Sequence, residues 1–261
     1  RRPPRSTLFP YTTLFRSTHC HVGAYQDPVA MLRAAEKAGV AIVAVTEDAD
    51  EYRRLRTRLG PRDHVDVALG LHPLRAASFG PNDLARFLRL VPQTTWIGEV
   101  GLDYSRAGAA SAKAQRRVFD VVLTEAQPGR HPLTVHSRGA EKEVIHHLAQ
   151  AALPAILHWY TGPTRLVDEA LQAGLYFSIN IAMTRSPRFA SLMRAIARER
   201  ILLETDGPYA KDQGRSAHPD GLGAVAAAVA NAWGMSPAES MSVLISNQRR
   251  FLSEGALGSE R

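Results

Sequence analysis

The sequence of 261 residues contains a single cysteine, Cys20. One thiol excludes an intrachain disulfide, so we expect a fold held by its hydrophobic core and a cytoplasmic location, where thiols stay reduced. No apolar run reaches the roughly 18 residues that a membrane-spanning helix needs, so we expect no membrane partner. The segment Leu222 to Trp233 is shorter than that and includes Asn231.

Lysine is also scarce, so the positive charge of this chain comes mostly from arginine. A net charge of +7 usually indicates an acidic partner such as nucleic acid. However, Arg1, Arg2, Arg5 and Arg16 lie in a leader without Asp or Glu, and subtracting them leaves only +3. GC-rich coding explains the excess of arginine more simply than phosphate binding does. The overall charge is therefore weak evidence for a DNA partner.

The first 17 residues differ in origin from the rest of the sequence. Read in one frame, a common short-read sequencing adapter encodes residues 7–17, and its upstream portion encodes residues 1–6. We therefore predict that residues 1–17 are a non-native leader and exclude them from fold reasoning. Residues 18–261 contain no linker-like stretch, so we expect them to form one domain.

Short β-branched segments alternate with amphipathic segments along the whole of this domain. The predicted strands are Thr18–Val22, Ala41–Thr46, Val65–Leu71, Thr95–Val100, Leu133–His136, Ala155–His158, Leu175–Asn180 and Ile201–Thr205. The predicted helices include Pro28–Ala38, Asp50–Leu59, Asn82–Leu90, Lys113–Ala126, Ala140–Ala151, Thr164–Ala173 and Pro187–Ala197, with more after Pro219. Eight strand–helix alternations predict an α/β protein with a (β/α)8 TIM-barrel fold, and a doubly wound open sheet is the alternative.

Polar residues cluster at the carboxyl ends of these predicted strands. They are His19, His21, His72, Glu99, His136, His158, Asn180 and Asp206. In a barrel these strand ends form one face, where active sites are built, so residues far apart in sequence would converge there. In an open sheet they would be spread along an edge instead.

Six of these residues can bind metal, which is more than one tetrahedral zinc ion needs. They are His19, His21, Glu99, His136, His158 and Asp206. They suit two divalent ions, with His19, His21 and Asp206 at one, His136 and His158 at the other, and Glu99 bridging them. We predict Glu99 and Asp206 as catalytic residues, with Asp206 orienting or deprotonating the attacking water. Zinc, manganese or magnesium would each accept this mixture of ligands.

Five segments carry a family resemblance that extends over nearly all of Thr18 to Leu252. They are Thr18-His19-Cys20-His21, Gly70-Leu71-His72-Pro73, Gly98-Glu99-Val100-Gly101-Leu102-Asp103-Tyr104, Val135-His136-Ser137-Arg138 and Glu204-Thr205-Asp206-Gly207-Pro208. In this order they resemble the TatD family of metal-dependent deoxyribonucleases. The resemblance implies a TIM-barrel hydrolase that cleaves DNA phosphodiester bonds with divalent metal, and it supports the six metal ligands. Asn247 and Phe251 fit the family's closing helix.

Three departures from the family pattern are visible. The family normally has Asp two residues before the first His, where this chain has Ser17 inside the predicted leader. Trp159 follows His158 where a Cys is usual, and 176–183 reads Tyr-Phe-Ser-Ile-Asn-Ile-Ala-Met. The second and third departures resemble the TatD-type nuclease of the Qat anti-phage system, which implies a defence role and partner proteins from that system.

Six further residues are candidates for substrate contact or for support of the ligands. His72 either contacts substrate or caps the turn before Pro73. Arg138 either holds a phosphate or pairs with Glu141. Asp103 and Glu204 are predicted to fix ligand histidines or water, with a surface role as the alternative. Trp159 either stacks on an unpaired base or packs at the barrel rim, and the same holds for Tyr160.

The leading hypothesis is a nuclease that trims DNA ends with unpaired nucleotides. A metal-dependent amidohydrolase or esterase acting on a small substrate or an aminoacyl ester could use the same ligands. Many such barrels bridge their metals with a carbamylated lysine, and none of Lys37, Lys113, Lys142 and Lys211 lies at a predicted strand end. A non-catalytic subunit of a defence complex is the third hypothesis, although it would not need six convergent ligands.

Overall fold

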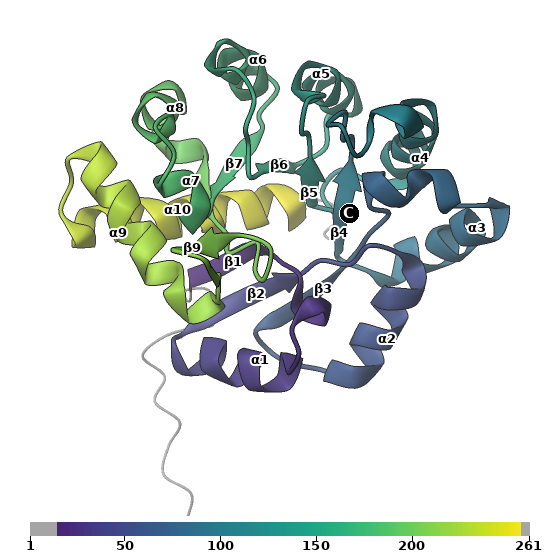
Figure 1. Cartoon of the computed structure of the whole chain (residues 1–261), viewed down its shortest axis with the longest axis horizontal. Coiled ribbons are helices and arrows are strands. Elements are labelled where there is room, and N and C mark those ends of the chain that lie inside the picture. Colours follow the sequence, from purple (N-terminus) through teal and green to yellow (C-terminus); the bar gives the residue numbers. More distant parts are fainter. Residues whose placement is uncertain (1–14, 257–261) are drawn as a thin grey trace, which may run out of the picture.

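The computed structural model describes residues 15–256, in which eight parallel strands stand in chain order around a barrel (Figure 1). The strands are β1 (Phe15–Cys20), β2 (Val40–Ala44), β3 (Val65–Leu69), β4 (Trp96–Gly101), β5 (Leu133–His136), β6 (Ala155–His158), β7 (Tyr176–Ile179) and β8 (Ile201–Leu203). Most of the predicted leader, residues 1–14, lies outside the described residues. Phe15 to Ser17 begin β1 and pair with β2.

Hydrogen bonds between the segments around β8 and β1 join the first and last strands. The Asp206 amide donates to the His19 carbonyl oxygen at 3.0 Å, and the Thr18 hydroxyl donates to the Leu203 carbonyl oxygen at 3.1 Å. Two residues before His19, and so on the same face of β1, the Ser17 hydroxyl accepts a hydrogen bond from the Thr205 amide at 3.0 Å. An open sheet would leave these edges apart, so the TIM-barrel prediction is confirmed and the doubly wound alternative is wrong.

Helices cover the outside of the strands, close to where the sequence places them (Figure 1). They are α1 (Pro28–Lys37), α2 (Ala49–Leu59), α3 (Pro81–Leu90), α4 (Ala112–Glu125), α5 (Glu141–Ala151), α6 (Val167–Gln172), α7 (Ile181–Thr184), α8 (Phe189–Ala195), α9 (Leu222–Trp233) and α10 (Pro237–Ala256). At α1, Pro28 occupies the first turn and the Asp27 carboxylate accepts the amides of Val29 and Ala30, both at 3.0 Å. Proline and an N-cap aspartate together explain why this helix begins there.

Two predicted helices are shorter in the structure. The first turn of Thr164–Ala173 is a 3-10 turn, Thr164–Leu166, and only α6 is α-helical. The region 187–197 contains α8, and a separate one-turn helix, α7, precedes it because the Asn180 side chain accepts the Met183 amide at 3.1 Å and starts a helix directly after β7. A small hairpin of β9 (Lys211–Asp212) and β10 (Arg215–Ser216) follows β8. Two-residue strands carry no detectable periodicity, so the sequence does not predict them.

The amino-terminal end of the barrel is filled by α10. Inside the barrel, Phe251 packs in a buried cluster, with ring centroids 5.8 Å from Trp96 and 4.9 Å from Tyr176. Trp96 and Tyr176 are the first residues of β4 and β7, so this contact lies at the end opposite to the polar strand ends. The Asn247 amide also donates to the Ile201 carbonyl oxygen at 2.9 Å. These contacts give α10 the role of a closing helix.

Between residues 15 and 256, none of the helices combines the length and the apolar character that crossing a membrane requires.

We predict that Phe251→Ala lowers the free energy of unfolding by about 3–5 kcal/mol, because it leaves a cavity in a packed aromatic cluster. Urea denaturation followed by tryptophan fluorescence measures this, and Phe251→Leu should cost clearly less. Metal binding by the folded variant should match the wild type, since the carboxyl strand ends lie at the other end of the barrel. A loss below 1 kcal/mol on the same scale would show that α10 does not close the core.

Candidate metal centre

The structure brings all six predicted metal-ligating residues together at the carboxyl end of the barrel. His19 lies near the end of β1 and His21 directly after it, Glu99 lies in β4, His136 ends β5, His158 ends β6, and Asp206 follows β8. All are buried except His136, whose side chain is 17% exposed. Five strands that are distant in sequence therefore contribute to one buried polar cluster, as the barrel prediction requires.

Glu99 lies at the centre of this cluster, with two histidines facing its Oε1 and three, including His72, facing its Oε2. Oε2 lies 3.1 Å from His21 Nε2 and 3.5 Å from His19 Nε2. Oε1 lies 2.8 Å from His136 Nδ1 and 3.0 Å from His158 Nε2. The carboxylate therefore joins two separate groups of nitrogen atoms.

Asp206 completes the first of these two groups. Its Oδ1 lies 3.5 Å from His21 Nε2 and 3.7 Å from His19 Nε2. The ligating atoms of His19, His21 and Asp206 all lie within 4.8 Å of one another, as they must around a single ion.

Contacts between nitrogen atoms indicate that the cluster is shaped for cations. His19 Nε2 lies 3.3 Å from His21 Nε2, and His136 Nδ1 lies 3.2 Å from His158 Nε2. Glu99 Oε2 is buried and accepts no hydrogen bond from a described residue. A buried carboxylate oxygen without a donor is costly, and a divalent cation would satisfy it. The residues therefore fit divalent metal.

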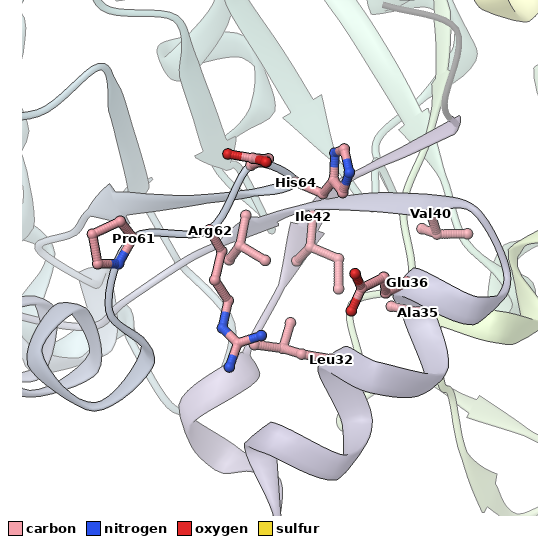
Figure 2. A pocket seen from close by; sticks show the side chains of 10 residues that line it. Leu32, Ala35, Glu36, Val40, Ile42, Pro61, Arg62 and His64 are labelled. Atoms are coloured by element: carbon pink, nitrogen blue, oxygen red, sulfur yellow. The ribbon is translucent and has the colours of Figure 1, made fainter. Parts of the chain in front are cut away.

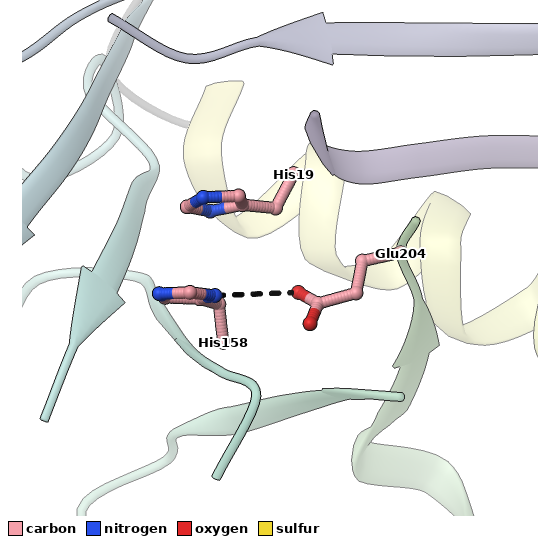
Figure 3. A group of neighbouring side chains, drawn as sticks. All are labelled: His19, His158 and Glu204. Atoms are coloured by element: carbon pink, nitrogen blue, oxygen red, sulfur yellow. Dashed lines mark ion pairs between the residues drawn. The ribbon is translucent and has the colours of Figure 1, made fainter. Parts of the chain in front are cut away.

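The opposite ring nitrogens of three histidines face other polar side chains. His19 Nδ1 lies 2.7 Å from the Thr134 hydroxyl, and His136 Nε2 lies 2.8 Å from Asp103 Oδ2. His158 Nδ1 lies 3.8 Å from Glu204 Oε2, as Figure 3 shows. Such contacts fix the orientation of an imidazole and leave its other nitrogen directed at the centre.

Glu204 is itself held by three donors, which leaves it poorly placed to serve as a ligand. Its carboxylate accepts the Asn180 side-chain amide at 2.9 Å, the Trp159 backbone amide at 3.1 Å and the Ser178 hydroxyl. In Figure 3 the His158 ring lies beside Glu204 and stacks on the His19 ring, with centroids 3.8 Å apart. We therefore expect Glu204 to orient His158.

Two opposing effects set the pKa values of the carboxyl groups in the cluster. Burial favours the neutral form of each carboxyl, and neighbouring histidines favour its charged form. Burial favours the neutral form of Glu99, but the neighbouring His72 and His158 outweigh it and hold the pKa of the Glu99 carboxyl well below its usual range. Burial raises the pKa of the Asp206 carboxyl to about 7. Burial also acts on Asp103, yet its contact with His136 lowers the pKa of that carboxyl to about 2. The two central carboxylates therefore lie in distinct environments.

His72 caps the turn before Pro73, which confirms one of its two sequence interpretations, while its contact with substrate stays a prediction. Its Nδ1 accepts the Leu74 amide at 3.2 Å and so caps the turn that begins at Pro73. Its Nε2 lies 3.3 Å from Glu99 Oε2, at the edge of the cluster. The turn contact therefore holds the imidazole beside the centre.

Arg138 and Trp159 lie farther out, beyond the ends of β5 and β6. The Arg138 side chain is exposed and forms no ion pair with any residue in the described range, while Glu141 accepts the Gly139 amide at 3.1 Å. The predicted alternative pairing of Arg138 with Glu141 is therefore not formed. Trp159 is half-buried against the core with a positive φ of 37°, and Tyr160 is buried with its hydroxyl on the Pro163 carbonyl oxygen. Tyr160 is thus a packing residue.

Two residues near the centre are not among the site residues predicted from the sequence. Thr134 lies two positions before His136 on β5, so strand alternation puts both on the same face, and that signal was available. Tyr209 follows Asp206 by three residues, and its ring centroid lies 4.7 Å from that of His21. No sequence pattern identifies Tyr209, because its position depends on the loop after β8.

A pocket elsewhere on the molecule lies outside the barrel between α1 and the segment that leads into β3 (Figure 2). Its lining residues include Leu32, Glu36, Ile42, Arg62 and His64, and it contains none of the predicted site residues. It is therefore separate from the polar cluster.

The family of the chain follows from a match over almost the whole described barrel. A family model described as "TatD related DNase" matches residues 18–253, which include every candidate residue of the centre. The chain belongs to the TatD family. The family and the hydrolase class predicted from the five motifs are confirmed.

Two curated relatives and one solved structure show how far the similarity extends. The "3'-5' ssDNA/RNA exonuclease TatD" of Musicola paradisiaca is 33% identical over 195 residues, 70% of this chain and 73% of the relative. The "Uncharacterized metal-dependent hydrolase YabD" of Bacillus subtilis is 26% identical over 248 residues, 90% of this chain and 97% of the relative. The crystal structure of the TatD homologue YJJV from Escherichia coli superimposes with a TM-score of 0.82 at 24% identity, covering 93% of this chain and 98% of that one, which shows the shared fold.

We predict that Glu99→Gln lowers the amount of metal retained after dialysis and weakens manganese or zinc binding at least about tenfold, because both groups of histidines lose their shared carboxylate. Asp103→Asn should weaken binding by about 10–100-fold, since it acts through His136 alone. Elemental analysis and calorimetric titration measure both. Glu125→Gln, which removes an exposed carboxylate at the end of α4, is the matched control. Wild-type metal content in Glu99→Gln would contradict the assignment.

Proposed function

We propose that this chain is a two-metal deoxyribonuclease that removes nucleotides from the ends of DNA. The observation that carries the proposal is the position of Glu99, whose Oε2 faces His19 and His21 and whose Oε1 faces His136 and His158. A carboxylate shared between two ions about 3.5–4 Å apart is the arrangement that phosphoryl hydrolysis uses. Membership of a DNase family supports the substrate.

The ligands divide between the two proposed ions as follows. His19, His21 and Asp206 would hold one, and His136 and His158 the other, with one oxygen of Glu99 directed at each. Zinc, manganese or magnesium fits these donors. When bound, divalent ions of this kind polarise the phosphate and lower the pKa of an attacking water.

The side chains of the protein supply position and proton transfer. Asp206, next to His21, is the carboxylate that we assign to orient the attacking water and accept its proton. Asp103 and Glu204 keep His136 and His158 in their orientations. Arg138, exposed beyond β5, is the group that we assign to a non-bridging phosphate oxygen, because its guanidinium is available for a bidentate contact.

The proposed substrate is single-stranded DNA at a free end. The name of the Musicola paradisiaca relative, a 3'-5' exonuclease on single-stranded DNA and RNA, supports this choice. The half-buried Trp159 just beyond the end of β6 is one aromatic group that we assign to stacking on an unpaired base. The resemblance of 176–183 to the Qat anti-phage branch supports a role in defence with partner proteins, and the single buried Cys20 is compatible with the cytoplasm.

The rival function, hydrolysis of an amide or ester of a small molecule, has weaker support. A carbamylated lysine bridge would need a lysine at a strand end. Lys37 ends α1, Lys113 and Lys142 lie in α4 and α5, and Lys211 begins the small hairpin after β8. Glu99 occupies the central position instead.

We predict that the protein cleaves end-labelled single-stranded DNA with added divalent metal, and that a chelator abolishes cleavage. Asp206→Asn should lower kcat by about 100-fold or more, because general-base catalysis contributes about 10²–10⁴-fold. Gel analysis of the products measures both effects and reveals whether nucleotides leave from an end. Cleavage that survives the chelator would remove the metal mechanism, and a metal-loaded protein active only on aminoacyl esters or amides would establish the rival.

We predict that Arg138→Ala raises KM for DNA by about tenfold and makes cleavage less sensitive to salt, because one phosphate contact is lost. Arg138→Lys should recover part of this affinity, since a single charge replaces the guanidinium fork. Arg194→Ala, at the end of α8 away from the strand ends, is the control. An unchanged KM in Arg138→Ala would show that this arginine does not contact the substrate.

A further inference from the structure

Tyr209 is the most exposed of the large hydrophobic side chains in the described part of the chain. Its exposed fraction is 52%, compared with 43% for Leu74 and 37% for Leu88. A single exposed apolar residue on a protein surface is ordinary and carries no meaning by itself. The position of Tyr209 is what distinguishes it, because its ring lies at the mouth of the barrel beside the proposed metal centre.

The ring is in direct contact with a ligand of that centre. The ring centroids of Tyr209 and His21 lie 4.7 Å apart at an angle of 72°, which is an edge-to-face contact. His21 Nε2 in turn lies 3.1 Å from Glu99 Oε2. Only the His21 side chain therefore lies between the aromatic ring of Tyr209 and the carboxylate at which the phosphate would react.

The backbone on both sides of Tyr209 is fixed by hydrogen bonds. The His21 amide donates to the Gly207 carbonyl oxygen at 2.9 Å, and the Ala210 amide donates to the Asp206 carbonyl oxygen at 2.8 Å. On the other side, the Ala217 amide donates to the Ala210 carbonyl oxygen at 2.8 Å. The ring is thus presented to solvent by an ordered segment that joins β1 to the loop after β8.

We propose that Tyr209 is the stacking surface for the base of the terminal nucleotide whose phosphate lies at the metal centre. This inference rests on the proposed nuclease function and specifies how that site selects unpaired ends. A base inside a duplex is stacked on both faces and a base at a duplex end is held by its pair, whereas a terminal unpaired base can turn one face to the ring. Stacking of this kind accepts every base, so the residue selects for an unpaired end and not for sequence.

The alternative role for Tyr209 is to hold the His21 imidazole in place. The two roles differ in what they predict. A stacking surface affects the KM for DNA and only when the terminal base is present. A support for His21 affects metal affinity and kcat whether or not that base is present.

The experiment compares wild type, Tyr209→Phe and Tyr209→Leu on single-stranded oligonucleotides with intact ends and on matched oligonucleotides that lack the base at the 5′ or the 3′ terminal nucleotide. On intact ends, Tyr209→Leu should raise KM about five- to hundredfold with kcat nearly unchanged, the range that base stacking provides. Tyr209→Phe should behave like wild type, because it keeps the aromatic face. On one of the two abasic substrates, wild type and Tyr209→Leu should have the same raised KM.

A binding measurement provides a second readout without turnover. In the Asp206→Asn background, a 2-aminopurine at the DNA terminus should lose fluorescence on binding, and Tyr209→Leu should abolish that loss. Leu88→Ala, an exposed apolar substitution on α3, should change neither readout.

Three results would overturn the stacking role. They are an unchanged KM in Tyr209→Leu, a defect of equal size on intact and both abasic ends, and a loss of metal affinity in Tyr209→Leu. If the wild type did not cleave DNA, the proposed function would be wrong, and the fluorescence measurement alone would decide whether Tyr209 stacks on a terminal base.

Discussion

The buried carboxylate of Glu99 is the constraint on which the rest of the site depends. A charged group at 2% exposure is unfavourable unless cations or donors surround it. Here five imidazoles face its two oxygens, and two of them, His136 and His158, are in contact with Asp103 and Glu204. The carboxylate lies between the two groups of histidines and contacts both. Without it, these imidazoles would have no shared partner, so the arrangement of the whole cluster depends on this one side chain.

The residues that stabilise the fold and the residues of the polar cluster lie at opposite ends of the barrel. At the amino-terminal strand ends, Phe251 packs against Trp96 and Tyr176 and closes the interior with apolar contacts. At the carboxyl ends, the Asp206 amide bonds to the His19 carbonyl oxygen, so the contact that joins the last strand segment to the first also places two members of the cluster side by side. Changes at one end of the barrel can therefore be tolerated without disturbing the other.

Much of the fold and the centre was predictable from particular residues. The eight β-branched segments and the polar residues at the ends of seven of them predict both the barrel and the convergence of His19, Glu99, His136, His158 and Asp206, because parallel strands in a closed barrel share one carboxyl face. Boundaries were less predictable. The chain enters α7 early because Asn180 caps it, and the hairpin after β8 is too short for a periodic signal.

The sequence by itself determined which residues are available for metal chemistry and on which strands they lie, since residue type and alternation are local properties. Only the tertiary structure decided which oxygen of Glu99 faces which histidines, that the Glu204 carboxylate faces His158, and that Tyr209 lies beside His21. These arrangements depend on side-chain orientation and on loops that cross between strands. The physical reason is that such contacts join residues far apart in the sequence, as Ser17 and Thr205 illustrate at 188 positions apart, and their geometry exists only once the barrel has closed.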